Sequence, residues 1–348
     1  MLRLRRGTVA AVKTDGGRVV RLRVGLEDGE QRTAIAYPGL TGPVEPGDQV
    51  MVNTEAQDLG LGSGGFDIVH ANLSRTFEGG PGPAHVMKLN YTSLQHAVEP
   101  VEQGLEEVQR PLALPVGVLA LHGQLAPAAF ALAQTRPGAR CGYVQIAGGA
   151  LPGALSDTVA ALLARDVLVD HVTAAPCFGG PLEAITVEGA LHAGAASLGW
   201  DCAVVGAGPG ILGSASALGH GGMSALAAAH AGLSLGCDVV VAPRLSGGDP
   251  RERHQGLSHH TRTVLDMLLV PVTVAVPEPL SAPAAQELEE ALGGTAHRRH
   301  NVDVAALLES YAASGLPATT MGRSIEEDQD FFASALAAGA VLAAALET

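Results

Sequence analysis

The side chains best suited to chemistry lie close together in one stretch of the sequence, from Arg244 to Thr261. Ser258 has the position of a helix N-cap, because an apolar helical pattern follows it. In that pattern His259 falls on the polar side of the helix, and His260 approaches its core side. The stretch therefore predicts a helix that begins beside several functional side chains.

Two chemistries compete for this stretch. A divalent metal could be ligated by its histidines with one carboxylate, namely by His254, His259 and His260 with Asp249 or Asp266. Their spacing matches no established metal motif. The arginines favour an anionic ligand instead, and the expected ligand-binding set is Arg244, Ser246, Asp249 and Arg253, next to Arg251. A solvated loop that caps a helix is the alternative for any single residue.

A glycine-rich segment, Gly219 to Ser224, leads into an alanine-rich helical pattern. Free backbone N–H groups at a helix start attract phosphate or carboxylate. Gly221 and Gly222 are therefore predicted to bind an anion, with His220 as an additional donor. A plain helix cap is the alternative.

A second glycine-rich segment, Val204 to Gly213, contains a G-x-G-x-x-G pattern after a predicted strand. The pattern would make Gly206, Gly208 and Gly210 ligands of a nucleotide cofactor. Pro209 interrupts it, and the acidic residue expected to bind a ribose is missing. A tight turn that brings a helix close to the sheet is the favoured interpretation.

Three further side chains are candidates because of their positions. The chain has nineteen arginines and only two lysines, Lys13 and Lys88, and an ammonium group does chemistry that a guanidinium does not. Lys88 lies in a strand-like segment, residues 85–95, although codon bias would also explain its rarity. His122 and Arg323 each follow a predicted strand. The candidate acid–base residues are thus Lys88, His122, His220 and His259, and Arg323 joins the ligand-binding set.

From Pro115 onward, short β-type runs alternate with alanine-rich helical patterns. The predicted strands are 116–121, 142–147, 171–175, 202–205, 239–242, 272–276 and 318–321. The predicted helices are 127–133, 156–163, 185–198, 223–235, 258–269, 282–292 and 302–313, followed by a buried C-terminal helix near 331–346. This order predicts a doubly wound, mostly parallel, Rossmann-like sheet that binds ligands beyond the carboxyl ends of its strands.

The first part of the chain has a different pattern. From Gly7 to Asn53, apolar and polar residues mostly alternate between glycine-rich turns. This is typical of a small antiparallel barrel or sandwich, for which docking or oligomerisation is the expected role. The expected domains are a β-module at 1–80, a connecting segment at 81–111 and an α/β domain at 112–348.

Composition narrows the functional class. The chain has 348 residues, a formal charge of −14 and 3% aromatic residues, which argues against nucleic-acid binding. No signal peptide or membrane span is expected, and four widely spaced cysteines without a C-x-x-C pair suit reduced thiols. A cytoplasmic protein is therefore expected.

Four motifs carry a resemblance to a known family: Arg-Arg-Gly-Thr-Val ending at residue 9, His-Val-Met-Lys-Leu-Asn-Tyr-Thr ending at 92, Leu-Ser-His-His-Thr ending at 261 and Met-Gly-Arg ending at 323. With them the chain resembles, over nearly its full length, a bacterial family catalogued as domain of unknown function 3866. The resemblance implies a single full-length unit and supplies no activity, cofactor or catalytic residue.

Two functions remain open from the sequence. One is an enzyme that acts on a small phosphate- or carboxylate-bearing metabolite at the strand ends. The other is a non-catalytic ligand-binding or regulatory protein, in which the β-module contacts a partner or a second subunit. Neither function requires a particular cofactor, and a divalent metal and a nucleotide both remain candidate cofactors.

Overall fold

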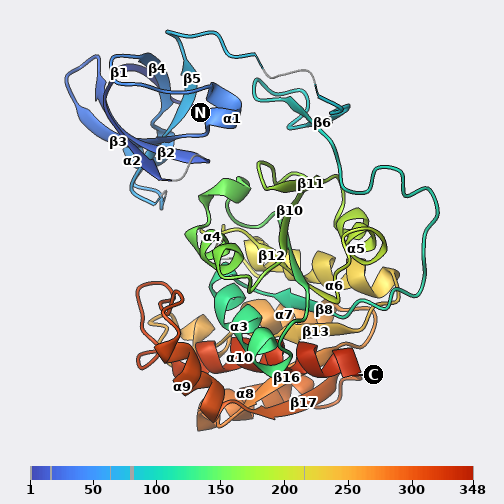
Figure 1. Ribbon diagram of the computed structural model, residues 1–348. Helices are drawn as coiled ribbons and strands as arrows, with labels where there is room; N and C mark the ends of the chain where they lie inside the picture. The colour runs from blue at the N-terminus through green and yellow to red at the C-terminus, as the bar shows by residue number, and fades with distance from the viewer. Residues whose placement is uncertain (1, 16–17, 63, 79–81, 215, 348) are drawn as a thin grey trace. The chain divides into compact units, whose positions relative to one another are not determined.

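The computed structural model describes residues 2–15, 18–62, 64–78, 82–214 and 216–347 (Figure 1). The chain divides into two compact units, residues 1–98 and 99–348. The division falls inside the segment expected to connect two domains. Each unit has its own apolar core.

The N-terminal unit contains a closed five-stranded barrel, as the alternating pattern predicts. Its strands are β1 (Leu4–Asp15), β2 (Val19–Leu26), β3 (Gln31–Ala36), β4 (Gln49–Asn53) and β5 (Asp67–Asn72). They follow the order β1-β2-β3-β5-β4, with β3 and β5 parallel and the other pairs antiparallel. Alternate side chains such as Val9, Leu22 and Val50 fill the interior. Two short helices, α1 (Pro38–Thr41) and α2 (Glu55–Asp58), lie between strands.

The segment predicted as one strand at residues 85–95 is instead a hairpin. It consists of β6 (Val86–Lys88) and β7 (His96–Val98), which pair antiparallel. The chain turns directly after Lys88, because Leu89 and Tyr91 both have positive φ angles, 47° and 61°. Lys88 therefore ends a strand, and it does not share a strand face with Asn90 and Thr92.

The C-terminal unit is built on an eight-stranded parallel sheet, which confirms the predicted Rossmann-like class. Its strands are β8 (Val116–Leu119), β9 (Cys141–Ile146), β10 (Asp170–Ala174), β11 (Leu182–Ala184), β12 (Cys202–Ala207), β13 (Val239–Ala242), β16 (Thr273–Glu278) and β17 (Arg298–Asp303). The order across the sheet is β11-β10-β9-β12-β8-β13-β16-β17. Strand order thus runs both ways from β8, as in doubly wound folds.

Helices cover both faces of this sheet (Figure 1). One apolar core contains the inner sides of α5 (Val187–Ala196), α6 (Ser224–Ser234), α7 (His259–Met267) and α8 (Ala282–Leu292). The other contains α3 (Leu125–Thr135), α4 (Asp157–Ala164), α9 (Ala305–Ala313) and α10 (Gln329–Ala344). Alternate strand residues supply the two cores: Val144 belongs to the first and Tyr143 to the second. None of the helices in the described residues is long and apolar enough to cross a bilayer.

Two parts of the sheet differ from the prediction. Residues 318–321 form no strand, and Thr320 makes only an isolated bridge with Arg323. The last strand is β17, whose residues are nearly all exposed because it lies at the sheet edge and β16 is its partner. Edge strands carry polar side chains that hide the alternation on which sequence prediction relies.

Candidate functional site

A buried polar cluster lies beyond the carboxyl end of β13. The chain leaves β13 through Arg244 and folds back as a small hairpin of β14 (Leu245–Ser246) and β15 (Gly256–Leu257) before α7. Ser258 caps α7, as predicted, and its Oγ accepts from the N–H of His260 at 3.3 Å. Because of this hairpin, Arg244 contacts residues that follow it by more than ten positions in the sequence.

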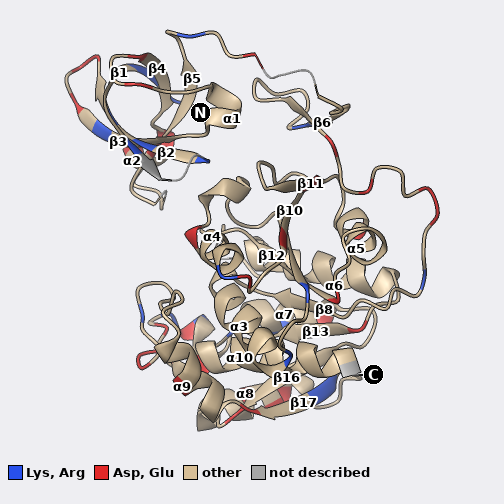
Figure 2. Ribbon diagram, viewed as in Figure 1, with Lys and Arg blue, Asp and Glu red and all other residues tan. Residues whose placement is uncertain are grey.

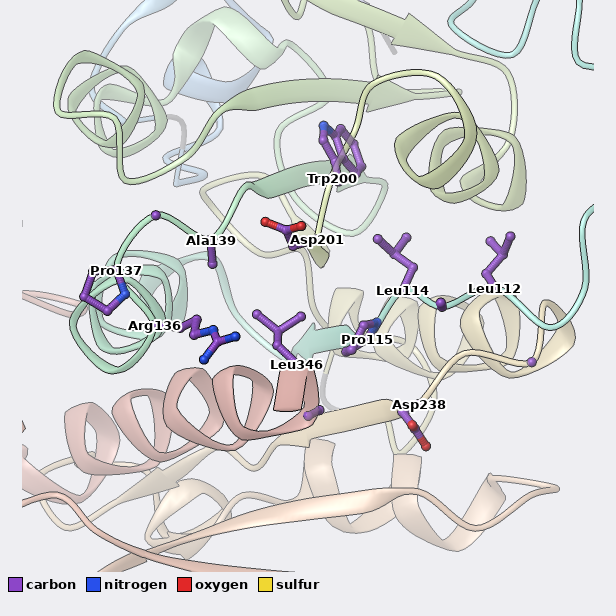
Figure 3. Close-up of a pocket in the computed structure, with 14 residues that line it drawn as sticks. Leu112, Leu114, Pro115, Arg136, Pro137, Ala139, Trp200, Asp201, Asp238 and Leu346 are labelled. Carbon is purple, nitrogen blue, oxygen red and sulfur yellow. The ribbon is translucent and has the colours of Figure 1, made fainter. Parts of the chain in front are cut away.

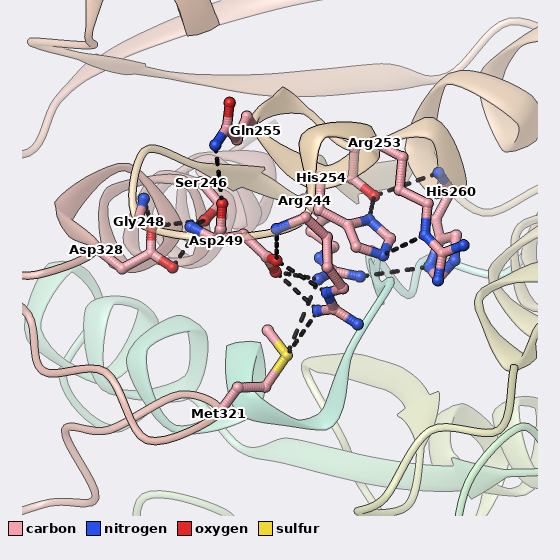
Figure 4. Close-up of polar contacts among 12 residues, drawn as sticks. Arg244, Ser246, Gly248, Asp249, Arg253, His254, Gln255, His260, Met321 and Asp328 are labelled. Carbon is pink, nitrogen blue, oxygen red and sulfur yellow. Dashed lines mark hydrogen bonds and ion pairs between the residues drawn. The ribbon is translucent and has the colours of Figure 1, made fainter.

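Asp249 is the centre of the arginine part of the cluster (Figure 4). The carboxylate is buried and accepts from Arg251 at 2.8 and 2.9 Å and from Arg244 at 3.0 Å. Arg323 Nη2 lies 3.5 Å from the same carboxylate. Burial alone would raise the pKa of Asp249, but the hydrogen bonds and charge of Arg251 and the charge of Arg244 lower it well below its ordinary value. Asp249 is therefore ionised.

A second buried carboxylate, Asp328, fixes the loop from the other side. It accepts from Ser246 Oγ at 2.8 Å and from the N–H of Gly247 at 3.0 Å. It also accepts from Arg323 Nε at 2.9 Å. Arg323 thus bridges the two carboxylates.

Four histidines pack beside Arg244. The rings of His220 and His260 stack with centroids 3.6 Å apart and planes at 10°. His259 lies 4.3 Å from His260, and His254 lies 5.1 Å from His259, measured between ring centroids. His220 comes from the loop between β12 and α6, and the other three come from the loop before α7 and its first turn.

The four imidazoles are neutral. Burial lowers the pKa of His260 to about 2 and that of His254 to about 3, and nearby positive charges, including Arg244, act in the same direction. Burial also lowers the pKa values of His220 and His259. Each ring therefore carries one N–H and one lone pair at neutral pH.

Three buried polar atoms of this cluster have no hydrogen-bond partner among the described residues: His220 Nδ1, His259 Nε2 and Arg244 Nε. Most buried polar atoms in folded proteins are paired, because an unpaired one costs about 1–3 kcal/mol. Unpaired atoms from three different side chains at one place indicate a binding site.

Three histidines of the cluster meet the geometry of a metal site, and they are not the three expected from the sequence. His220, His259 and His260 each offer one ring nitrogen, and these atoms lie within 4.8 Å of one another. In His254 both ring nitrogens face other groups: Nδ1 lies 2.8 Å from Ser258 Oγ, and Nε2 accepts from Arg253 Nε at 3.4 Å. His220 therefore takes the place predicted for His254. Neither Asp249, which is held by arginines, nor Asp266 belongs to the group.

His122 belongs to a separate network at the same edge of the sheet. Its Nδ1 donates to Ala207 O at 3.1 Å, so its Nε2 accepts from Ser156 Oγ at 2.7 Å. Ser156 in turn caps α4 by accepting from Val159 N at 3.0 Å. Tyr143 donates to the end of the same strand, β12, at Gly206 O, over 3.1 Å. Both ring nitrogens of His122 are thus occupied.

The predicted nucleotide-binding glycines lie where loops touch. A Cβ on Gly208 would lie 2.3 Å from Ala150 O, and one on Gly206 would lie 3.3 Å from Leu119 Cβ. Gly210 needs glycine for its positive φ of 69°. The helix that should follow a dinucleotide motif begins only at Ser224. Backbone contact and a left-handed turn account for these glycines.

The predicted anion-binding glycines have a different surrounding from the one expected. The N–H of Gly221 donates to Leu212 O at 2.7 Å, so it does not point to a ligand. A Cβ on Gly222 would lie 3.0 Å from Nδ1 of both His220 and His260. Gly222 therefore leaves room for the two imidazoles.

Most of the predicted site residues come together, but the glycines Gly206, Gly208 and Gly210 lie elsewhere, and so do two side chains. His122 lies in its own network, and Lys88 belongs to the N-terminal unit, where it is buried at the end of β6. Sequence reasoning missed Asp328 and Ser156. The signal for both was local: each directly precedes a helix, where Asp and Ser are common caps.

A cavity of about 650 Å³ lies at the opposite edge of the sheet. Its lining includes Leu114, Ala139, Asp201 and Asp238, which precede β8, β9, β12 and β13 (Figure 3). In doubly wound folds, functional side chains gather at the carboxyl ends instead. The size of this cavity is therefore not a reason to place the functional site there.

The fold and the cluster define a two-unit protein with an N-terminal barrel and a Rossmann-like domain that carries a histidine- and arginine-rich site at its carboxyl edge. A comparison with protein families matches residues 33–339 to the family described as "protein of unknown function (DUF3866)". The chain belongs to this family. Comparisons with curated proteins and with solved structures find no match.

Proposed function

We propose that the protein is an enzyme that binds a small anionic metabolite, bearing phosphate or carboxylate, at the arginine cluster beyond β13. One observation carries this proposal: three guanidinium groups, of Arg244, Arg251 and Arg323, contact two carboxylates, Asp249 and Asp328, and a fourth, of Arg253, lies beside the ring of His254. The local charge is positive in a chain whose formal charge is −14. Guanidinium groups bind phosphate and carboxylate with paired hydrogen bonds.

The environment strengthens this attraction. Helices α3 and α6 carry no charged side chain and are drawn entirely in tan (Figure 2). Arg244 is buried, its Nε has no partner in the part of the chain that the structure describes, and burial lowers its pKa to about 10. An anion that accepted from Nε would both pair this donor and offset the excess charge.

Arg253 provides the sharpest test of this function. It makes no ion pair with a residue in the described ranges, and its side chain contacts the ring of His254. We expect Arg253→Gln to weaken the binding of inorganic phosphate or a phosphate monoester by on the order of tenfold, about 1.4 kcal/mol. Calorimetric titration of chelator-treated protein measures this.

The matched control is Arg262→Gln, on the following helix, where Arg262 lies 3.7 Å from Glu287 and outside the cluster. It should bind phosphate as the wild type does. Equal affinities in all three proteins, or no binding at all, would refute the anion site. Turnover of whichever compound binds then separates the enzyme from a non-catalytic ligand-binding protein, whose support is the separate barrel unit.

We also propose that the protein acts in the cytoplasm. The support is chemical: Cys141, Cys177, Cys202 and Cys237 are all buried thiols, which are stable in a reducing compartment.

A further inference from the structure

We propose that His220, His259 and His260 bind one divalent transition-metal ion of the zinc class. This inference concerns metal binding alone, and it holds whether or not the arginine cluster binds a metabolite. It rests on the placement of the three rings, on the hydrogen bonds that orient them and on the space left beside Gly222.

The first support is the convergence of three imidazoles from two separate segments, the loop before α6 and the first turn of α7. Their ligand nitrogens lie within 4.8 Å of one another. Two nitrogens on one tetrahedral zinc ion lie about 3.3 Å apart, given Zn–N bonds of about 2.0–2.1 Å. Because the rings of His220 and His260 are stacked with their planes at 10°, one of them must also rotate to aim its in-plane lone pair at a shared ion. Imidazole is a ligand that suits zinc, copper, nickel and iron.

The second support is the orientation of His220. Its Nε2 lies 3.0 Å from Ala217 O, which can only accept, so Nε2 carries the proton. The lone pair is then on Nδ1, which is buried and has no partner among the described residues. A histidine that ligates a metal commonly donates its other N–H to a backbone carbonyl in this way.

His259 supplies the same kind of atom from the other loop. Its Nε2 is buried and without a partner in the described part of the chain. Its ring centroid lies 5.3 Å from that of His220. Two imidazole nitrogens without a partner among the described residues thus lie within 4.8 Å of each other.

Gly222 keeps that space open. A side chain there would begin 3.0 Å from Nδ1 of His220 and of His260, which is tighter than nine in ten observed contacts of a Cβ atom. The glycine has no positive φ angle, so its backbone does not require it. The two neighbouring imidazoles therefore explain why Gly222 has no side chain.

The positive charge of the neighbouring arginines and the number of protein ligands both bear on how a metal ion would be held here. Arg244 Nη1 lies 3.5 Å from His260 Nδ1, and a lone cation there would oppose a metal. Its charge is offset by Asp249 at 3.0 Å. Three protein ligands leave a coordination position for water or an anion, as in catalytic rather than structural zinc sites. The metal would therefore lie next to the guanidinium groups.

The test is zinc binding by the full chain. Protein stripped with a chelator and dialysed should take up one zinc ion per chain, measured by elemental analysis and by calorimetry. Bound Co²⁺ should give the visible absorption of a tetrahedral nitrogen site. We expect His220→Ala and His259→Ala to reduce bound zinc to substoichiometric amounts, while His300→Ala, on the exposed strand β17, binds as the wild type does.

Gly222→Ala is the second variant, because it removes no ligand. It should weaken zinc binding while its far-ultraviolet circular dichroism stays like that of the wild type. The metal site is overturned if the stripped wild type takes up no metal, or if all four variants bind zinc equally. The proposed anion site at the arginines is tested separately, by measuring phosphate binding to the protein stripped of metal.

Discussion

Two histidine clusters lie at the same carboxyl edge of one sheet, and they differ in how their polar atoms are paired. At His122, the ring nitrogens bind Ala207 O and Ser156 Oγ, and the hydroxyl of Ser156 also caps a helix. Around His260, ring nitrogens of His220 and His259 are buried without a partner among the described residues. Burial is common to both clusters, so it does not indicate function by itself.

The two clusters differ in whether their buried polar atoms have hydrogen-bond partners. A paired buried network contributes to stability, whereas each unpaired polar atom costs about 1–3 kcal/mol. Natural proteins retain such a cost mainly where a ligand or a reaction needs the group. The comparison therefore favours a structural role for His122, which the sequence suggested as a catalytic residue, and supports the metal binding proposed for His220 and His259.

The largest effect should be seen when acid breaks the paired cluster. Burial lowers the pKa of His122 to about 4, although its hydrogen bond to Ala207 opposes the shift. The unfolded chain, with a histidine pKa of about 6.5, binds more protons than the native state between pH 6.5 and 4. The stability from neutral His122 is present above pH 6.5 and is lost as the pH falls toward 4.

This loss amounts to about 3 kcal/mol at pH 4. His122→Gln has no titrating group, so its free energy of unfolding should fall by about 3 kcal/mol less than that of the wild type between pH 7 and 4. Urea unfolding at a series of pH values measures both. Parallel pH curves for the two proteins would show that His122 is not held neutral by the fold.

A smaller effect is expected from removing the hydroxyl of Ser156. Ser156→Ala loses a helix cap, about 1 kcal/mol, and leaves His122 Nε2 unpaired, about another 1 kcal/mol. Thr186→Ala is the matched control, because Thr186 caps α5 through a 2.9 Å bond from Gly189 N. Chemical denaturation should show Ser156→Ala to be the less stable variant, and equal losses would mean that the bond to His122 contributes nothing.

The fold was predictable where the hydrophobic pattern is strong. The runs at 239–242 and 282–292 correspond to β13 and α8 at the same bounds. The pattern failed at β17, whose residues Arg298–Asp303 are mostly polar because strand pairing alone holds them at the edge. At 318–321 a β-type composition has no neighbouring strand to pair with, so the segment stays irregular.

The site was predictable only where it is contiguous in sequence. Arg244, Asp249 and His259 lie within one stretch, so their types and spacing indicated a cluster. His220 joins them from another loop, and Asp328 lies far from them along the chain. Their contributions depend on strand order, which places β13 beside β8 and which no local pattern encodes.

The smallest change in the free energy of unfolding is expected in the cluster around His260. His259→Leu removes a buried nitrogen that has no described partner, so in the presence of a chelator the free energy of unfolding should stay within about 0.5 kcal/mol of the wild type or rise. His254→Leu is the contrasting variant: its ring bonds to Ser258 Oγ at 2.8 Å, so it should lose about 2 kcal/mol. Urea titrations without metal compare the two. If His259→Leu proved the more destabilised, the nitrogen of His259 would have to be paired in the native protein, and the cluster around His260 would no longer differ from that around His122 at this position.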